Sequence, residues 1–228
     1  MSEPNPDKSS SLVLYGSREL AAPETAQNRI LSEMVEASLA MARETAVAHV
    51  DLDALVREGK RIQRNEGMTP EDIQAFHLFH QAAAAGHAEA EFLVFECYFG
   101  GHGISEDLSN SIEWLHQSAE HGFADAQFHL GRGYSLGKGV PQDYAEAVNW
   151  YRMAAAQEGV FVQALAQNNL GYCYESGQGV MQDYEEAAKW YRMAAERGMV
   201  YAQDSLGCCY GVGQGVPQDY AEIGRAHV

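Results

Sequence analysis

The sequence predicts an all-α fold in which pairs of helices stack into a right-handed α-α superhelix, or solenoid. The first observation is a set of four tyrosines at intervals of 36, 40 and 36 residues: Tyr98, Tyr134, Tyr174 and Tyr210. The second is a Gly-x-Gly pair that begins three residues after each tyrosine. The third is a set of tryptophans and alanines that keep the same intervals. Self-similarity with a period of roughly 20–50 residues is the signature of a repeat protein.

The first 50 residues lie outside this pattern. Residues 1–22 are rich in serine, proline and asparagine, and we expect them to form a flexible N-terminal lead. They lack the basic segment and the apolar run of a secretory signal. From residue 23 to residue 50, a partly apolar face with Ile30 and Met34 predicts a helix. We expect this helix to cap the open end of the array; the alternative is that it binds a partner or a second copy of the chain.

The array itself begins with a divergent copy of the repeat over residues 51–87. Gly67 lies 36 residues before Gly103, and Leu78 takes the position that Trp114 has in the next copy. More regular copies follow over residues 88–223, and the last of them is incomplete. The sequence therefore predicts four full units and the start of a fifth.

The first helix of each unit is predicted by an apolar spacing. Ala126, Leu130 and Tyr134 lie at i, i+4 and i+8, which is one face of a helix. Gly131 recurs in later copies, and we expect it to allow a neighbouring helix to approach closely. Gly137 is expected to end the helix in the left-handed conformation that glycine adopts without strain.

The second helix of each unit begins at an aspartate. The Asp143 carboxylate can accept hydrogen bonds from free backbone N–H groups, and Glu146 can complete a capping box. Ala147, Trp150 and Ala154 then form an apolar stripe at i, i+3 and i+7. One such pair of helices cannot bury both of its apolar faces, so neighbouring pairs must stack.

The interval of 40 residues comes from four extra residues within the segment 156–167. Four residues are close to one turn of an α-helix. We therefore expect a lengthened helix here that keeps its apolar face.

The motif from Ala126 to Ala155 reads A-x3-LG-x2-Y-x2-G-x-GV-x2-D-x3-A-x2-W-x3-AA. It resembles the Sel1-like repeat, which belongs to the tetratricopeptide-like helical solenoids, and the resemblance covers about residues 88–223. It implies an adaptor that holds other proteins together, often in bacterial signalling, and it implies neither catalysis nor a cofactor.

The pattern breaks at residues 224–228, where the second helix of the fifth unit should continue. From Glu222 onward the residues resemble a translated sequencing adapter. We expect a non-native tail here and a longer natural protein; the alternative is an ordinary frayed end.

Composition excludes two classes of partner. The chain has 15 Lys and Arg against 32 Asp and Glu, a net charge of −17, whereas phosphate backbones require a basic face. It also lacks the roughly 18 consecutive apolar residues of a membrane-spanning helix. With no secretory signal and no evident cysteine pairing, we expect a cytoplasmic protein that binds neither nucleic acid nor membrane.

The histidines and cysteines are the side chains of this sequence that metal binding or redox chemistry would use. Seven of the nine histidines fall between residues 65 and 131, but His80 and His116 share a repeat position with Arg152 and Arg192. This favours a surface position for a cation over a metal site, and leaves open a pH-sensitive surface. Three cysteines share a repeat position with a glycine, which is typical of a small, packed site: Cys97, Cys173 and Cys209.

In solenoids of this kind the first helices line the concave face, and residues there that do not serve packing are free to bind. Spacing from Leu130 and Tyr134 selects ten candidates: Glu89, Phe92, Glu96, Phe99, Asp125, Phe128, Arg132, Asn168, Tyr172 and Glu175. Aromatic residues flanked by acids suit a basic or amphipathic peptide. The alternative for Phe92 and Phe128 is that they belong to the core.

The sequence thus predicts a scaffold that binds a protein or peptide on its concave face, with no catalytic residues, metal or cofactor. One alternative is an interaction or regulatory domain of a larger protein. The other is a hydrolase of the cysteine-rich Sel1-like branch, whose helix-bridging cysteine pairs are missing from this chain.

Overall fold

The computed structural model describes residues 50–157 and 159–221, and within these ranges the chain forms nine α-helices and no strand. The helices are α2 (Leu52–Ile62), α3 (Pro70–Ala83), α4 (Ala88–Gly100), α5 (Leu108–Glu120), α6 (Ala124–Leu136), α7 (Tyr144–Ala156), α8 (Val160–Ser176), α9 (Tyr184–Glu196) and α10 (Val200–Val212). The predicted lead at 1–22, nearly all of the predicted capping helix at 23–50 and the predicted tail at 224–228 lie outside the described residues.

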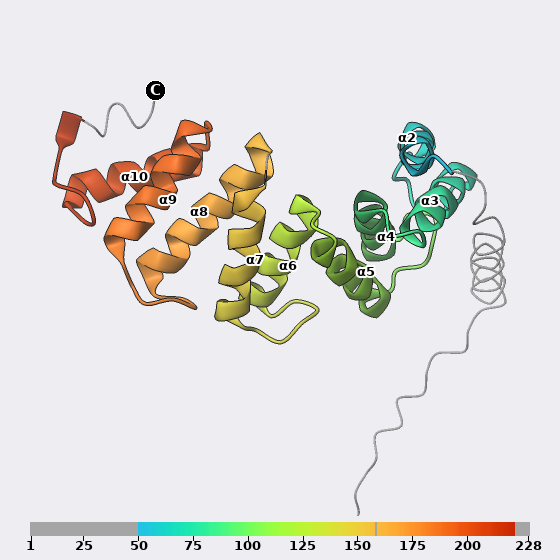
Figure 1. The fold of residues 1–228 in the computed structure, drawn as a ribbon, viewed down its shortest axis with the longest axis horizontal. Helices are drawn as coiled ribbons and strands as arrows, with labels where there is room; N and C mark the ends of the chain where they lie inside the picture. The colour runs from blue at the N-terminus through green and yellow to red at the C-terminus, as the bar shows by residue number, and fades with distance from the viewer. Residues whose placement is uncertain (1–49, 158, 222–228) are drawn as a thin grey trace, which may run out of the picture.

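The helices follow one another along the long axis of the molecule in chain order, from α2 at one end to α10 at the other (Figure 1). Each helix packs on the next, so α6 contacts α7 and α7 contacts α8. We call α4, α6, α8 and α10 the first helices and α3, α5, α7 and α9 the second helices. The first helices α6 and α8 also contact each other. The predicted all-α solenoid is confirmed.

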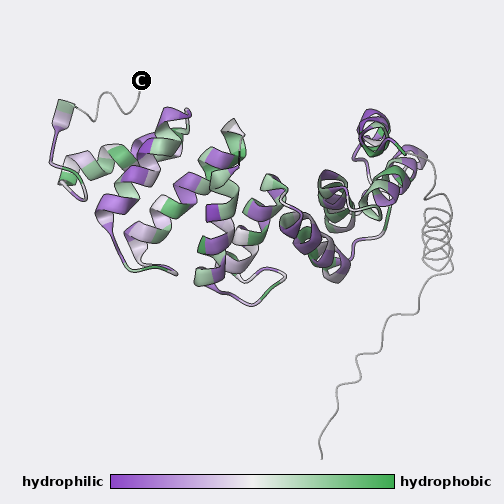
Figure 2. Cartoon of the chain, viewed as in Figure 1, coloured by the Kyte–Doolittle hydropathy of each residue, from purple (hydrophilic) through white to green (hydrophobic). Residues whose placement is uncertain are grey.

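The hydrophobic core is shared between neighbouring units. One buried cluster combines Phe128 of α6, Val148 and Tyr151 of α7, and Leu170 of α8. Figure 2 shows hydrophobic residues on all the helices of the array, mixed with hydrophilic ones. Because a single pair of helices would leave half of such a cluster in water, the fold depends on stacking.

Glycine ends the first helices as predicted. Gly137 and Gly177 follow α6 and α8 with φ of 65° and 72°, in the left-handed region. The N–H of Gly137 donates to the Gly133 carbonyl, which satisfies one of the free acceptors at the end of the helix.

The second glycine of each Gly-x-Gly pair lies against the preceding unit, and in the last two pairs it lies against the backbone of that unit. Gly179 has φ of 73°, and a Cβ there would overlap the carbonyl group of Tyr144 at the start of α7. Gly215 stands in the same relation to Tyr184 at the start of α9. The turn of one unit therefore rests on the second helix of the preceding unit, at a distance that no other residue permits.

The capping of the second helices confirms one half of the prediction and corrects the other. Asp143 accepts hydrogen bonds from the N–H groups of Ala145 and Glu146, at 2.9 and 3.1 Å. The reciprocal bond of a capping box is absent, because the Asp143 N–H donates to the Tyr134 carbonyl at 2.9 Å. The Asp183 N–H donates to the Tyr174 carbonyl at 2.9 Å in the same way, so this hydrogen bond recurs from one repeat to the next.

The four extra residues lengthen a first helix, as predicted. Helix α8 has 17 residues, whereas α6 and α10 have 13 each. The added turn preserves contact with the preceding unit, since the Gln163 side-chain amide donates to the Ala155 carbonyl at 3.0 Å. Gln127 makes the same bond to Ala119 at the start of α6.

Candidate functional site

The ten predicted binding residues lie on three first helices, and the structure divides them by exposure. Four are exposed: Glu96, Phe99, Arg132 and Tyr172. Four are half-buried: Glu89, Asp125, Asn168 and Glu175. Two are buried: Phe92 and Phe128. We call the exposed side of α4, α6 and α8 the first-helix face.

Phe92 and Phe128 belong to the core, which is the alternative that their spacing left open. Their exposed fractions are 8% and 7%. The Phe92 ring packs against Phe95 and Phe123, with centroids 5.4 and 5.3 Å away. Phe128 packs against Tyr151 of α7, with centroids 6.0 Å apart. Neither ring is available to a partner.

Three of the predicted carboxylates lie on α4 and at the start of α6, where Lys60 acts on Glu89 and Glu96, and Asp125 acts on Glu96. Glu89 forms an ion pair with Lys60 of α2. Glu96 keeps solvent access, yet surrounding protein atoms and the nearby Asp125 carboxylate raise its pKa, against a smaller opposing effect of Lys60. We call Glu89, Glu96 and Asp125 the acidic group. With one lysine for three carboxylates, this group favours a further cation.

Glu175 and Asn168 each place a polar group in the interior of the protein. The Tyr191 hydroxyl of α9 donates to the Glu175 carboxylate at 2.5 Å. Burial and this carboxylate raise the pKa of Tyr191, so the phenol stays protonated and keeps donating. The amide oxygen of Asn168 is buried and has no hydrogen-bond partner among the residues that the structure describes.

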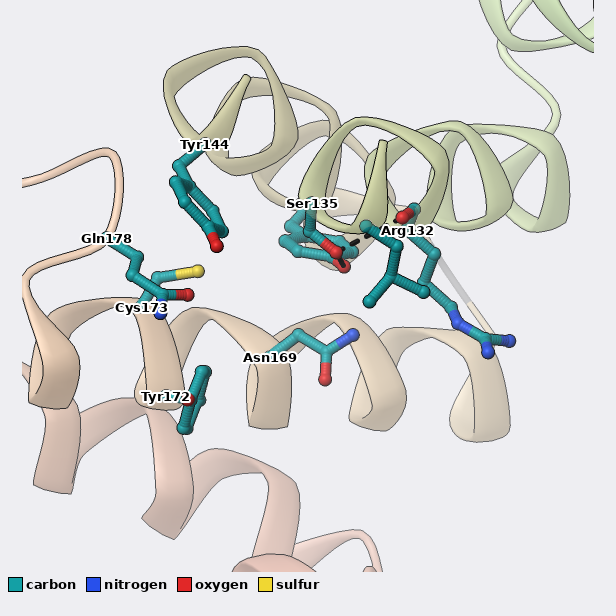
Figure 3. Close-up of a pocket in the computed structure, with 9 residues that line it drawn as sticks. Arg132, Ser135, Tyr144, Asn169, Tyr172, Cys173 and Gln178 are labelled. Carbon is teal, nitrogen blue, oxygen red and sulfur yellow. Dashed lines mark hydrogen bonds between the residues drawn. The ribbon is translucent and has the colours of Figure 1, made fainter. Parts of the chain in front are cut away.

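A pocket of about 390 Å³ opens between α6 and α8 (Figure 3). Its lining consists of Arg132, Ser135, Leu136, Tyr144, Tyr151, Asn169, Tyr172, Cys173 and Gln178. Two of the predicted residues, Arg132 and Tyr172, are among them. They occupy the same repeat position on adjacent first helices, so the solenoid itself brings them together.

Hydrogen bonds order one wall of the pocket. The Tyr151 hydroxyl donates to Ser135 Oγ at 3.3 Å, and Ser135 Oγ donates to the Arg132 carbonyl at 3.1 Å. The Gln142 side-chain amide donates to the Tyr144 hydroxyl at 2.9 Å. Burial raises the pKa of Cys173 to about 11, so its thiol is neutral near pH 7 and is a poor nucleophile.

Sequence reasoning missed the other seven lining residues. Ser135 gave a usable signal, because its repeat position carries the larger Phe99 and Glu175 in the neighbouring units. A small side chain at that position leaves space between helices. Tyr144 and Gln178 come from a helix start and a turn, and their periodicity indicates structure and not a site.

The histidine prediction needs one correction. His80 is not a surface cation, because it is only 5% exposed and burial, with a smaller effect of His77, lowers its pKa to about 4. Its ring lies edge-on to Trp114, with centroids 5.4 Å apart. Arg152 at the equivalent position is exposed and donates to the Tyr174 hydroxyl at 2.7 Å.

The cysteines pack as predicted. Cys97, Cys173 and Cys209 are buried, Cys208 is exposed, and all four are free thiols. Over residues 50–157 and 159–221, no group of three or more His, Cys, Asp or Glu residues is placed to hold a metal ion. No helix in those ranges combines the length and the apolar composition that crossing a bilayer requires.

Comparison with known proteins gives a family for the repeats. The model of the Sel1 repeat matches residues 63–87, 88–123, 124–158, 164–199 and 200–222. A crystal structure of a Sel1 repeat protein from Oxalobacter formigenes is similar, with 28% identity and a TM-score of 0.71 over 88% of this chain and 81% of that one.

A protective antigen present in uropathogenic Escherichia coli strains, which displays an SLR fold, is also similar. It shares 30% identity with a TM-score of 0.69, over 88% of this chain and 46% of the antigen. The chain thus spans less than half of the length of that antigen. No curated protein matches the chain.

Proposed function

Because the chain belongs to the Sel1 repeat family, we propose that it is a non-catalytic scaffold that binds a protein or peptide on its first-helix face. Sel1 repeats typically mediate protein interactions, and the family is generally non-catalytic. In this proposal the first-helix face is the concave side of the solenoid, and the protein works in the cytoplasm. With a net charge of −17, nucleic acids and anionic membranes are not the expected partners.

One observation carries the proposal. Arg132 and Tyr172 occupy one repeat position on adjacent helices, are exposed, and line the same pocket. Because both side chains are exposed, filling of the core does not require them at these positions. A pocket with an aromatic and an arginine at its mouth is typical of a site that anchors a partner side chain.

The acidic group sets the charge of the proposed partner. Burial raises the pKa of Glu96, and the nearby Asp125 carboxylate adds to this effect; a lysine or arginine of a partner would offset that repulsion. The proposed ligand is therefore a basic or amphipathic segment.

A longer natural protein with this chain as its interaction domain is compatible with the 46% coverage of the Escherichia coli antigen.

The test is affinity capture from cells of the source organism with two charge-reversed variants. Glu96→Arg places on α4 the residue that α6 carries at the same position, so the fold should tolerate it. Glu113→Lys, on the exposed side of α5, likewise places there the residue that α9 carries, Lys189. We expect Glu96→Arg to lose partners that the wild type and Glu113→Lys both retain. Equal recovery by all three proteins would contradict the proposed face.

A further inference from the structure

We propose that the pocket between α6 and α8 binds a carboxylate of the partner, in the place that a carboxylate of the chain itself fills in the next unit. The carboxylate belongs to the C-terminus of the partner or to an Asp or Glu side chain. This inference rests on the proposed function, because it assigns a ligand to part of the first-helix face.

The next unit shows what the pocket lacks. There the Tyr191 hydroxyl donates to Glu175 at 2.5 Å. The equivalent tyrosine of the pocket, Tyr151, donates at 3.3 Å to Ser135, which stands at the position of Glu175, and it also has a hydrogen bond with the Asn169 side chain. The hydroxyl is the same, but the carboxylate that would accept from it has been replaced by a side chain too short to fill the space.

The charge of the lining points to the same ligand. None of the nine lining residues is Asp or Glu, although the chain carries 32 acids against 15 Lys and Arg. Arg132 is the one lining residue with a full charge near pH 7. Within the described part of the chain, its guanidinium makes no ion pair or hydrogen bond, whereas Lys60 and Lys189 each pair with a glutamate.

The guanidinium lies against an aromatic ring. Its Cζ lies over the Phe128 ring, 6.0 Å from the centroid. Figure 3 shows the Arg132 side chain at one end of the pocket, extending away from Ser135, with Tyr144, Cys173 and Gln178 toward the other end. A guanidinium with free N–H groups binds a carboxylate through two parallel hydrogen bonds.

The remaining lining suits the group that carries the carboxylate. Tyr172 is 52% exposed and Leu136 is 54% exposed, so both offer apolar surface in the lining of the pocket. The Gln178 amide adds a donor, whereas the Asn169 side chain already has a hydrogen bond with Tyr151. A volume of about 390 Å³ exceeds what a carboxylate alone needs, which leaves room for an adjoining side chain.

The acidic group gives the bound segment a direction. Glu96 occupies on α4 the position that Arg132 has on α6. The two helices touch through the Phe92 and His129 rings, with centroids 5.5 Å apart, so their axes lie on the order of 10 Å apart. An extended chain covers this distance in about three residues. The proposed segment therefore carries a basic residue about three positions from its carboxylate, with the basic residue over α4 and the carboxylate between α6 and α8.

The test uses the purified chain and small probes of known chemistry. N-acetyl-phenylalanine carries a terminal carboxylate, its amide carries none, and the α-amide of N-acetyl-glutamic acid carries a side-chain carboxylate. Binding is followed by NMR shifts of the Asn169 and Gln178 side-chain amides. We expect at least one acid to bind roughly tenfold more tightly than the neutral amide, because charge-assisted hydrogen bonds are strong. The tighter acid identifies the source of the carboxylate.

Two variants copied from the next unit provide the controls. Ser135→Glu supplies the carboxylate from the chain itself, and Arg132→Tyr removes the cation; each installs the residue that α8 carries at that position. We expect both to lose the preference for the acids while keeping the circular dichroism spectrum of the wild type. Equal binding of acids and amide, or no shift at Asn169 and Gln178 with any probe, overturns the proposal. These outcomes are separate from the capture experiment, which depends on Glu96 and not on the pocket.

Discussion

The ring of Tyr191 lies directly on Gly171: a Cβ at Gly171 would be 2.6 Å from two carbons of the ring. Gly131 and Tyr151 repeat this arrangement in the preceding unit, with 2.7 Å for the nearest ring carbon. The expectation that the recurring glycine permits close approach of a neighbouring helix is confirmed. The approaching group is the tyrosine of the second helix in the same unit.

Gly171→Ala should therefore destabilise the protein even though alanine favours helix. Overpacking of a closed contact costs about 1–3 kcal/mol, which exceeds the roughly 1 kcal/mol gained in helix propensity. Denaturant unfolding would measure the difference. The matched control is the same change in a Tyr191→Leu background, where the smaller side chain makes room. A loss of equal size in both backgrounds would show that the ring contact is not the cause.

The two glycines of the turn after α8 should differ in their tolerance of alanine. Both have positive φ, 72° at Gly177 and 73° at Gly179. A Cβ at Gly177 would meet the Gln182 Cβ at an ordinary 3.4 Å, whereas one at Gly179 would overlap the Tyr144 carbonyl. Gly177→Ala should cost about 1–2 kcal/mol for the left-handed backbone alone. Gly179→Ala should cost clearly more in the same unfolding assay, and equal costs would argue against the contact between units.

The N-cap of α9 should contribute through its side chain and not through a capping box. Asp183 accepts from the Glu186 N–H at 3.0 Å, while its own N–H donates to Tyr174. Asp183→Ala should lower the free energy of unfolding by about 1 kcal/mol, whereas Asp183→Asn should be nearly neutral. Glu186→Ala should lose less than Asp183→Ala, since no reciprocal bond exists to be broken. A larger loss of unfolding free energy for Glu186→Ala would indicate that the capping box does form.

Stability should fall as the pH drops from about 6.5 to about 4. Burial lowers the pKa of His80 to about 4 in the folded state, so the unfolded chain takes up a proton first and acid favours unfolding. The stabilisation is complete above the unfolded pKa and amounts to about 3 kcal/mol at most. In the His80→Phe variant, which keeps a ring against Trp114, the denaturant midpoint of unfolding should change less between pH 7 and pH 5 than it does in the wild type.

His77 and His129 also have pKa values lowered by burial, so part of this pH dependence should remain in the His80→Phe variant. An unchanged pH profile in that variant would show that His80 is not a principal source of the acid sensitivity.

Periodicity alone was enough to establish the helical pairs, their ends and the lengthened α8. Each of these depends on residues within one unit and its copy: an apolar spacing, a glycine after the helix, an aspartate before the next. Such local signals act over a few residues of chain, and because they repeat along the sequence they can be recognised from the sequence alone.

Tertiary structure decided which exposed residues form a site. The pocket exists because Ser135 is smaller than Phe99 and Glu175 at the same repeat position, and because α6, α7 and α8 each contribute part of its wall. Likewise Phe92 and His80 are buried by neighbouring helices, and their own sequence context does not show it. Burial and shape are sums over segments distant in the chain, so a pattern read along one helix predicts the helix but not what covers it.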